Sequence, residues 1–275
     1  MGSRGLASAA VLFGLASLGS AEGRSHVAAA LLSEAESVQP GRPVRLGVRL
    51  AMEEGWHVYW ENPGDSGLPT EVLWKAPEGF RAGPVIRPAP EIFGEPPVVN
   101  YGHDGTVLLV SEMSVPSRIR ADGVTVAARV EWLECRDVCL PGRADLSIRL
   151  PVRPRMPAPS PENAEIFRSA LSNAPVPPDG WEISAERSGG GLAIFFRPAG
   201  KKRARVRGAY FFSRAPGSTD PSARQRFSLG GKGYALACPF FEGTGHVGRA
   251  DGVLVLYGAG GRREASLSID VPVSP

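Results

Sequence analysis

The fold of this chain is decided by residues 123–150, which read GVTVAARVEWLECRDVCLPGRADLSIRL. Apolar and polar residues alternate along both halves of this stretch, and such alternation is typical of half-buried β-strands. The pattern predicts strands at 124–134 and 144–150, joined by a nine-residue connection, 135–143, that contains two cysteines. The buried face of the first strand is expected to comprise Val124, Val126, Ala128, Val130 and Trp132.

Strand patterns of the same kind recur through the first half of the chain. They lie at 44–50, 56–60, 70–75 and 106–113, separated by turn-forming clusters of Asn, Pro, Gly and Asp. Short strands without intervening helices favour an antiparallel β-sandwich. We therefore predict that residues 25–152 form one β-sandwich domain.

The second half of the chain predicts a further β domain behind a linker. Residues 153–175 are rich in proline, which is typical of semi-rigid linkers, and 162–172 has the apolar spacing of a short helix. Together with the 34 glycines and 26 prolines of the chain, the patterns predict an all-β protein with a second, smaller β-sandwich-like domain at 176–275. Its expected strands lie at 192–196, 210–212, 227–229, 234–238, 253–257 and 267–271.

The N-terminus has the layout of a secretory signal peptide. Arg4 precedes an uncharged apolar run from Leu6 to Leu18, and small residues follow up to Ala21. The run is shorter than the roughly 20 residues that a membrane-spanning helix needs. We predict that residues 1–21 are removed, that the mature chain begins near Glu22 without a membrane span, and that it is exported to a compartment where disulfides persist.

The charge and the motif content argue against several classes of function. A formal net charge of +3 without an extended basic patch argues against nucleic-acid binding. No phosphate-binding loop or dinucleotide fingerprint occurs in a strand–loop–helix setting, so we expect no cofactor. The four histidines, at 26, 57, 103 and 246, lack the spacing of a helical metal site, and we expect no bound metal.

The cysteine pair is the sharpest chemical feature of the sequence. Strand alternation places Cys135 with Arg129 and Glu131 on the face opposite the buried residues, which predicts a position near solvent. A disulfide requires Cα atoms within about 7 Å, so a bridge from Cys135 to Cys139 requires a turn. A short, exposed bridge favours thiol–disulfide exchange. A passive structural bridge and a metal site are the alternatives, although paired zinc ligands usually follow Cys-x2-Cys spacing.

The third cysteine, Cys238, lies in the apolar run 234–241. This setting favours a buried, unreactive thiol. We therefore expect Cys135 and Cys139 to be bonded to each other and Cys238 to be free. A resolving or partner-linking thiol is the alternative for Cys238, because an unpaired cysteine in an exported protein can be reactive.

Three segments of the first half occur in a characteristic order. They are 55–69, which reads GWHVYWENPGDSGLP, the pair Tyr101-Gly102 followed by the strand 107–110, and 132–141, which reads WLECRDVCLP. Together they resemble the N-terminal periplasmic region of DsbD-type thiol:disulfide interchange proteins, particularly the ScsB-like branch. Residues 209–212 and 251–255 are similar, more weakly, to the second β region of that branch.

This resemblance implies an immunoglobulin-like fold for the first domain and a redox pair at Cys135 and Cys139. In the family, the pair accepts electrons from a thioredoxin-like domain, which receives them through a membrane-embedded domain, and then reduces periplasmic disulfide-bearing proteins. Neither of these two domains has a counterpart in this sequence. We therefore expect a separate thioredoxin-like or DsbD/ScsB-type membrane protein to supply the electrons.

The resemblance also implies that the pair is shielded by an aromatic cap loop. The matching stretch is 90–94, so Ile92 or Phe93 would be the cap, and Tyr59 would neighbour the pair. Four prolines at 88–97 would restrict the loop. The alternative for Phe93 is a side chain that fills the end of the sandwich core.

The sequence thus predicts a periplasmic protein-disulfide reductase that relays reducing equivalents between partner proteins through Cys135 and Cys139. The resemblance favours Cys139 as the nucleophile toward an oxidised partner. The alternative is a non-catalytic periplasmic adaptor in which the bridge only fixes a loop. A role in copper handling is a third hypothesis, which follows from the association of copper tolerance with the same branch.

Overall fold

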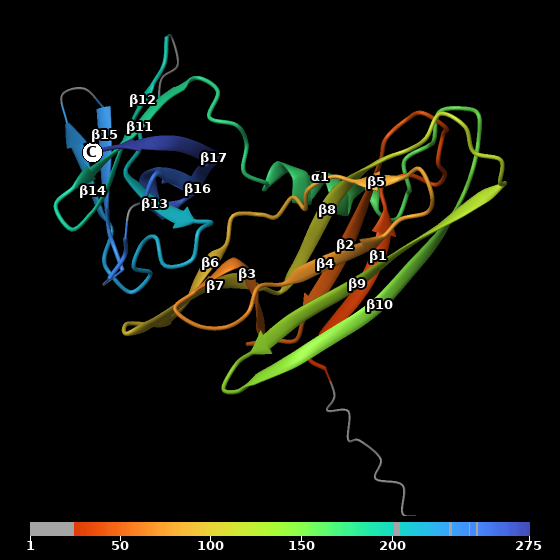
Figure 1. Cartoon of the computed structure of the whole chain (residues 1–275), viewed down its shortest axis with the longest axis horizontal. Helices are drawn as coiled ribbons and strands as arrows, with labels where there is room; N and C mark the ends of the chain where they lie inside the picture. The colour runs from red at the N-terminus through yellow and green to blue at the C-terminus, as the bar shows by residue number, and fades with distance from the viewer. Residues whose placement is uncertain (1–24, 201–203, 231–232, 242, 246) are drawn as a thin grey trace, which may run out of the picture.

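The structure is a computed structural model that describes residues 25–200, 204–230, 233–241, 243–245 and 247–275 (Figure 1). The predicted signal peptide lies outside these residues. The predicted all-β class is confirmed, since the described part of the chain consists mainly of strands with one α-helix and one short 3-10 helix. Neither of these helices is long and apolar enough to cross a membrane.

Two antiparallel sheets from the first half of the chain pack face to face. The four-stranded sheet has the order β1-β2-β8-β5, and the six-stranded sheet has the order β10-β9-β3-β7-β6, with β4 also paired to β9. Their strands are β1 Val27–Ser33, β2 Val44–Met52, β3 His57–Gly64, β4 Glu71–Lys75, β5 Arg81–Ala82, β6 Glu91–Glu95, β7 Val98–Asp104, β8 Thr106–Ser114, β9 Gly123–Cys135 and β10 Cys139–Pro151.

One hydrophobic core lies between these two sheets. It combines Leu46 and Val48 of β2 with Val126, Val130 and Trp132 of β9, all of them buried. The alternating burial along β9 is the one that the sequence predicts, because inward residues of a half-buried strand recur at every second position. The long β9–β10 hairpin extends past this core and carries both cysteines at its turn (Figure 1).

The helix predicted at 162–172 is present as α1, Ala164–Ser172. It buries Phe167 against Leu108 and Val110, which face outward from the four-stranded sheet. The helix therefore covers the side of this sheet that points away from the sandwich core.

The C-terminal strands form a seven-stranded sheet in the order β13-β16-β17-β11-β12-β15-β14, called here the C-terminal sheet. A short parallel pairing of β11 with β17 joins two antiparallel halves, and both halves contribute to a single core, as in a small sandwich. The elements are β11 Trp181–Ser188, β12 Gly191–Pro198, β13 Gly208–Ser213, β14 Arg226–Gly230, β15 Gly233–Pro239, β16 Arg249–Tyr257, the 3-10 helix Ala259–Gly261 and β17 Arg263–Ser274.

Five strands lie outside the predicted ranges, namely β1, β5, β6, β7 and β11. Among them, β1 is apolar on both faces and β6 and β7 are short segments separated only by Pro96-Pro97, whereas β11 does alternate and was missed. The stretch expected to be a cap loop is therefore a β-hairpin, β6–β7, in which Phe93 pairs with Asn100 and Ile92 with Tyr101. We call residues 91–104 the cap hairpin.

Candidate functional site: a disulfide at the end of a hairpin

Cys135 and Cys139 form a disulfide across the end of the β9–β10 hairpin. They are a cross-strand pair with Cα atoms 4.2 Å apart, and only residues 136–138 form the turn between them. The expectation of a nine-residue connection is therefore wrong, because the two strands remain paired up to the cysteines themselves. The predicted pairing is confirmed, and Cys238 is free.

The two sulfur-bearing residues differ in their access to solvent. Cys135 is 2% exposed, whereas Cys139 is exposed. The prediction that Cys135 lies near solvent is wrong. Alternation does place it on the face opposite Trp132, but β3 pairs with this end of β9 and covers that face with Tyr59. An attacking thiolate can therefore approach Cys139 more readily than Cys135.

Tyr59 is the side chain in closest polar contact with the disulfide. Its hydroxyl donates a hydrogen bond to Cys135 Sγ at 3.2 Å and lies 3.7 Å from Cys139 Sγ. Burial raises the pKa of Tyr59, with a smaller opposing effect of Ser66, so the hydroxyl remains a proton donor near neutral pH. Gly67, at φ +95°, allows the following loop to lie on the Tyr59 ring, since a Cβ there would come within 2.4 Å of it.

His57 and Phe93 form an aromatic layer next to the pair. His57 is paired with Cys135 in the β3–β9 register, and the Phe93 ring stacks on its imidazole with centroids 4.4 Å apart. The His57 ring also meets the Tyr59 ring edge-on at 5.4 Å. Because paired residues of adjacent strands share a face, Phe93, His57, Tyr59 and Cys135 all lie on the outer face of the six-stranded sheet.

The two candidate cap residues occupy opposite faces of the cap hairpin. Phe93 lies on the cysteine side, whereas Ile92, paired with Tyr101, lies on the other side and is 46% exposed. Phe93 belongs to none of the buried hydrophobic clusters in the described part of the chain, which does not support the alternative of a core-filling side chain. Covering of the pair by Phe93 remains a prediction.

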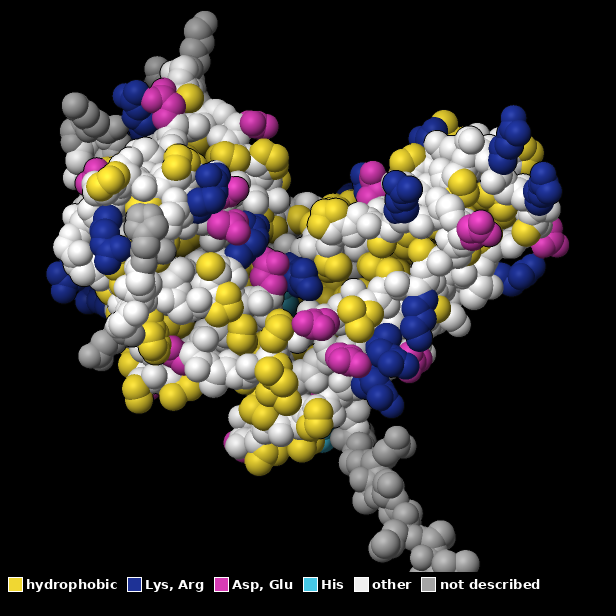
Figure 2. Space-filling view, in the orientation of Figure 1, with side chains coloured by type: hydrophobic (Ala, Val, Ile, Leu, Met, Phe, Trp, Pro, Cys, Tyr) yellow, Lys and Arg dark blue, Asp and Glu magenta, His cyan; other side chains and the backbone are white. Residues whose placement is uncertain are grey.

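Two exposed apolar side chains lie in segments next to the disulfide and Tyr59. Val138 lies in the turn between the cysteines and is 59% exposed, and Leu68 follows Gly67 and is 63% exposed. Figure 2 shows hydrophobic side chains gathered over the lower end of the molecule, where the β9–β10 hairpin turns. Exposed apolar groups concentrated around one reactive bond are typical of a surface that docks another protein.

The sequence reasoning missed two residues of this region. His57 could have been predicted as a site residue, since it lies two positions before Tyr59 on the same predicted strand and must share its face. Glu134 is buried at an inward position of β9, where its carboxyl group accepts hydrogen bonds from the Ser25 hydroxyl, the His26 amide and the Trp132 indole. These bonds fasten the start of β1 beside the cysteine hairpin.

Cys238 lies apart from the pair, in the core of the C-terminal sheet. It is fully buried, its thiol lies 3.5 Å from Gln225 Oε1, and burial raises its pKa. A protonated, inaccessible thiol is a poor nucleophile, in agreement with the predicted unreactive residue. Within the described ranges, no cluster of three or more His, Cys, Asp or Glu side chains could hold a metal ion.

The comparison with protein families supports the resemblance of the first domain. The sequence profile described as "Thiol:disulfide interchange protein DsbD, N-terminal" matches residues 28–151. The resemblance to the DsbD family is confirmed for this region. The match spans both sheets of the sandwich and includes Cys135, Cys139, Tyr59 and the cap hairpin.

A solved structure is similar in fold over most of the chain, including the part beyond residue 151. The N-terminal periplasmic domain of ScsB from Proteus mirabilis is similar with a TM-score of 0.65 at 15% identity, covering 91% of this chain and 94% of that one. The sporulation control protein Spo0M from Bacillus subtilis covers 65% of this chain and 69% of its own at 12% identity, but its TM-score of 0.24 supports no argument. No curated protein sequence matches the chain.

Proposed function

We propose that this chain is a periplasmic thiol:disulfide oxidoreductase of the reductase type, which relays electrons from a thioredoxin-like or DsbD/ScsB-type membrane donor to disulfide-bearing proteins. The observation that carries the proposal is the pairing of an exposed Cys139 with a buried Cys135 whose sulfur accepts a hydrogen bond from Tyr59. The DsbD match and the fold shared with a periplasmic domain of ScsB support both the chemistry and the location.

The relay balances as two successive thiol–disulfide exchanges. A donor thiolate attacks Cys139 Sγ, the Cys135–Cys139 bond breaks, and its electron pair leaves on Cys135 Sγ. The second donor thiolate then attacks the donor sulfur of the mixed disulfide and displaces Cys139. The donor becomes a disulfide, and the cysteine pair gains two electrons and, after protonation by solvent, two protons. In the reverse order, Cys139 attacks the disulfide of the oxidised partner, and Cys135 resolves the mixed disulfide.

In the proposed exchange, Tyr59 stabilises the sulfur that leaves when the disulfide breaks. Because Cys135 is buried, desolvation disfavours the thiolate that forms when the bond breaks. The Tyr59 hydroxyl already points at Cys135 Sγ and is positioned to stabilise that negative charge. The arrangement therefore directs attack to Cys139 and stabilises departure from Cys135.

The reduction potential of the pair distinguishes this function from a passive bridge. Structural disulfides of exported proteins have potentials below about −300 mV, whereas exchange proteins lie above that value. We expect equilibration of the protein with glutathione or dithiothreitol redox buffers to give a potential above about −300 mV. A potential well below this value, without electron exchange with a thioredoxin-like donor, would identify the chain as an adaptor instead.

Replacement of the cap candidate by Phe93→Ala is expected to expose the disulfide without unfolding the sandwich. Loss of the stacked ring should accelerate reduction by dithiothreitol about tenfold, a barrier change of about 1.4 kcal/mol. Urea unfolding should show only a small loss of stability, because Phe93 lies outside the buried clusters. An unchanged reduction rate with a loss of about 3–5 kcal/mol in the free energy of unfolding would instead identify a core residue.

A further inference from the structure

The C-terminal sheet contacts the cap hairpin on the side that faces away from the cysteines. Val99 and Tyr101 of β7 point to this side and are buried with Phe212 and Val253 of the C-terminal sheet. The Tyr101 ring meets the Phe212 ring edge-on at 5.0 Å, and its hydroxyl lies 3.1 Å from that of Tyr210. The hairpin therefore has one face on the redox site and the other on a separate core.

Polar contacts hold the two ends of the hairpin. At its entry, the Arg263 guanidinium donates hydrogen bonds of 3.3 Å to the carbonyl oxygens of Ala89 and Pro90. At its turn, the Ser222 hydroxyl lies 2.9 Å from the Pro97 carbonyl oxygen and 2.5 Å from the Asp65 carboxylate. The hairpin is thus fixed at its entry, its underside and its turn by the C-terminal sheet and by the loop between β13 and β14.

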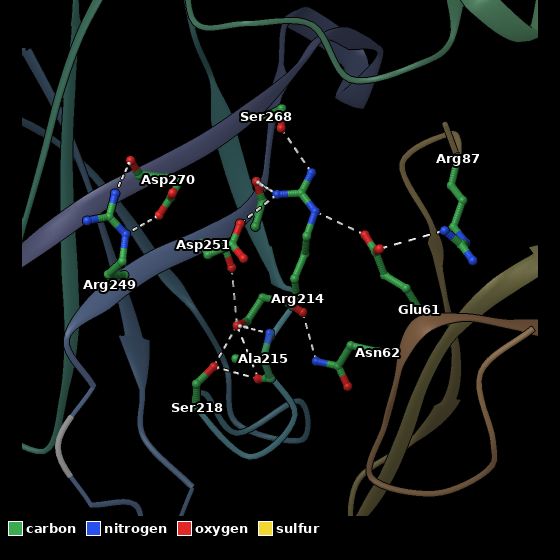
Figure 3. Close-up of polar contacts among 12 residues, drawn as sticks. Glu61, Asn62, Arg87, Arg214, Ala215, Ser218, Arg249, Asp251, Ser268 and Asp270 are labelled. Atoms are coloured by element: carbon green, nitrogen blue, oxygen red, sulfur yellow. Dashed lines mark hydrogen bonds and ion pairs between the residues drawn. The ribbon is translucent and has the colours of Figure 1, made fainter. Parts of the chain in front are cut away.

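A third set of contacts ties the same sheet to β3, the strand of Tyr59. Arg214 reaches Glu61 Oε1 at 3.0 Å while it also holds Asp251 at 2.8 Å and Ser268 at 2.9 Å (Figure 3). The neighbouring Asn62 donates a hydrogen bond of 2.8 Å to the Ser213 carbonyl oxygen. Glu61 and Asn62 lie two and three residues beyond Tyr59, so this network fixes the strand that carries the site.

The aromatic layer next to the disulfide depends on the position of the hairpin. Phe93 lies on β6, an edge strand that pairs only with β7 in the described chain. Gly102 of β7 lies close to β3, since a Cβ there would come within 2.3 Å of the Val58 carbonyl oxygen, and the Phe93 ring lies beside the same position. Among the residues that the structure describes, the hairpin joins its own sheet only through the pairing of β7 with β3, so its packing against the C-terminal sheet adds to how firmly Phe93 is held on His57.

We infer that the C-terminal sheet is a positioning element of the redox site, in which Ser222, Arg263 and Tyr210 hold the cap hairpin so that Phe93 covers the disulfide. These are positioning residues, since none of them contacts the cysteines. The inference rests on the proposed function and adds to it a role for the second half of the chain.

The test compares the rates at which dithiothreitol reduces the disulfide in matched variants of the full chain. The double variant Ser222→Ala/Arg263→Met removes the contacts to the turn and the entry of the hairpin, and we expect an acceleration of about fivefold, or about 1 kcal/mol of barrier. The control is Arg249→Met, which breaks an ion pair of 2.5 Å with Asp270 in the same sheet, away from the hairpin (Figure 3). It should reduce at the wild-type rate.

A double-mutant cycle separates positioning from a general loss of structure. In a Phe93→Ala background, the substitutions at Ser222 and Arg263 should produce no further acceleration, because the group that they position is absent. If the double variant is too unstable to measure, Tyr210→Phe removes only the hydroxyl contact to Tyr101 and should accelerate reduction in the same direction, by about twofold.

Equal rates for the wild type, the Arg249→Met control and the hairpin-contact variants would overturn the inference, as would full acceleration in the Phe93→Ala background. This readout uses a small dithiol and needs no biological partner. A failure of electron exchange with thioredoxin-like donors would therefore contradict the proposed function, whereas the rate comparison decides separately whether the C-terminal sheet positions the cap.

Discussion

The Cys135→Ala variant, once reduced, is expected to accumulate a stable mixed disulfide through Cys139, whereas Cys139→Ala should form almost none. Cys139 is exposed, so its thiolate can reach an oxidised partner, and without Cys135 no neighbouring thiol remains to resolve the adduct. In the Cys139→Ala protein the remaining thiol of the pair is 2% exposed and lies under Tyr59. The Cys135 thiolate can attack a partner only after Tyr59 has moved away from it.

Glutathione disulfide is a suitable oxidised probe, and intact-mass measurement reports the adduct. Attack by Cys135 requires breaking its hydrogen bond with Tyr59, and leaving that buried hydroxyl unpaired costs on the order of 2 kcal/mol, so the two variants should differ in rate by at least about 30-fold. The control is the Cys135→Ala/Cys139→Ala protein, in which only the buried Cys238 remains and no adduct is expected. Equal rates in the two single variants, or a faster Cys139→Ala protein, would assign the attacking role to Cys135.

Much of the sandwich was predictable because its central strands are half-buried. Along β9, one face lies on the core and the other on solvent, so the sequence alternates and reveals both the strand and its buried residues. The cap hairpin gave no such signal. Its strand β7 is buried on both sides over Tyr101, Gly102 and His103, and alternation disappears where both faces are covered.

The redox chemistry of the candidate site was predictable from the sequence, but the packing of side chains around the disulfide was not. The cysteine spacing identified the pair, and the family resemblance identified Tyr59, Ile92 and Phe93. Alternation also gave the correct face for Cys135, but it cannot say what packs on that face. The stacking of Phe93 on His57 depends on the registers of β6, β7 and β3 together, and a register between strands is not encoded in any single segment.

The contact between the two halves of the chain was equally inaccessible to the sequence. Trp60 and Tyr101 are apolar residues of strands that also serve the first sandwich, yet they are buried in a separate cluster with Phe212. Nothing local distinguishes them from core residues of one domain. Only the assembled structure shows that they join the sheet that carries the cysteines to the C-terminal sheet.

The same junction contains a buried histidine that should make the protein sensitive to acid. His103 of β7 is 7% exposed, and its Nε2 atom has no hydrogen-bond partner in the described structure. Burial, together with the positive charges of Arg87 and Arg263, lowers its pKa from 6.5 to about 3. The imidazole is therefore neutral in the folded protein throughout the range in which an unfolded histidine becomes charged.

The sign of the effect follows from proton binding. Between pH 6.5 and pH 3 the unfolded chain binds a proton at this position that the folded chain does not bind, so folding loses stability as the pH falls. At pH 7.5 both states are neutral and the full stability is present. Each pH unit below 6.5 removes about 1.36 kcal/mol from the free energy of unfolding until the pH reaches the folded-state pKa. At pH 4 the loss should therefore be about 3 kcal/mol.

We therefore expect wild type and His103→Gln to respond differently to acid in urea-unfolding experiments on the oxidised proteins. Glutamine carries no titrating group, so the stability of wild type relative to the variant should fall by about 3 kcal/mol between pH 7.5 and pH 4. Titrating carboxyl groups are common to both proteins and cancel in this difference. If the difference between the two proteins is the same at both pH values, a proton reaches His103 in the folded state, and the buried position cannot be the origin of acid sensitivity.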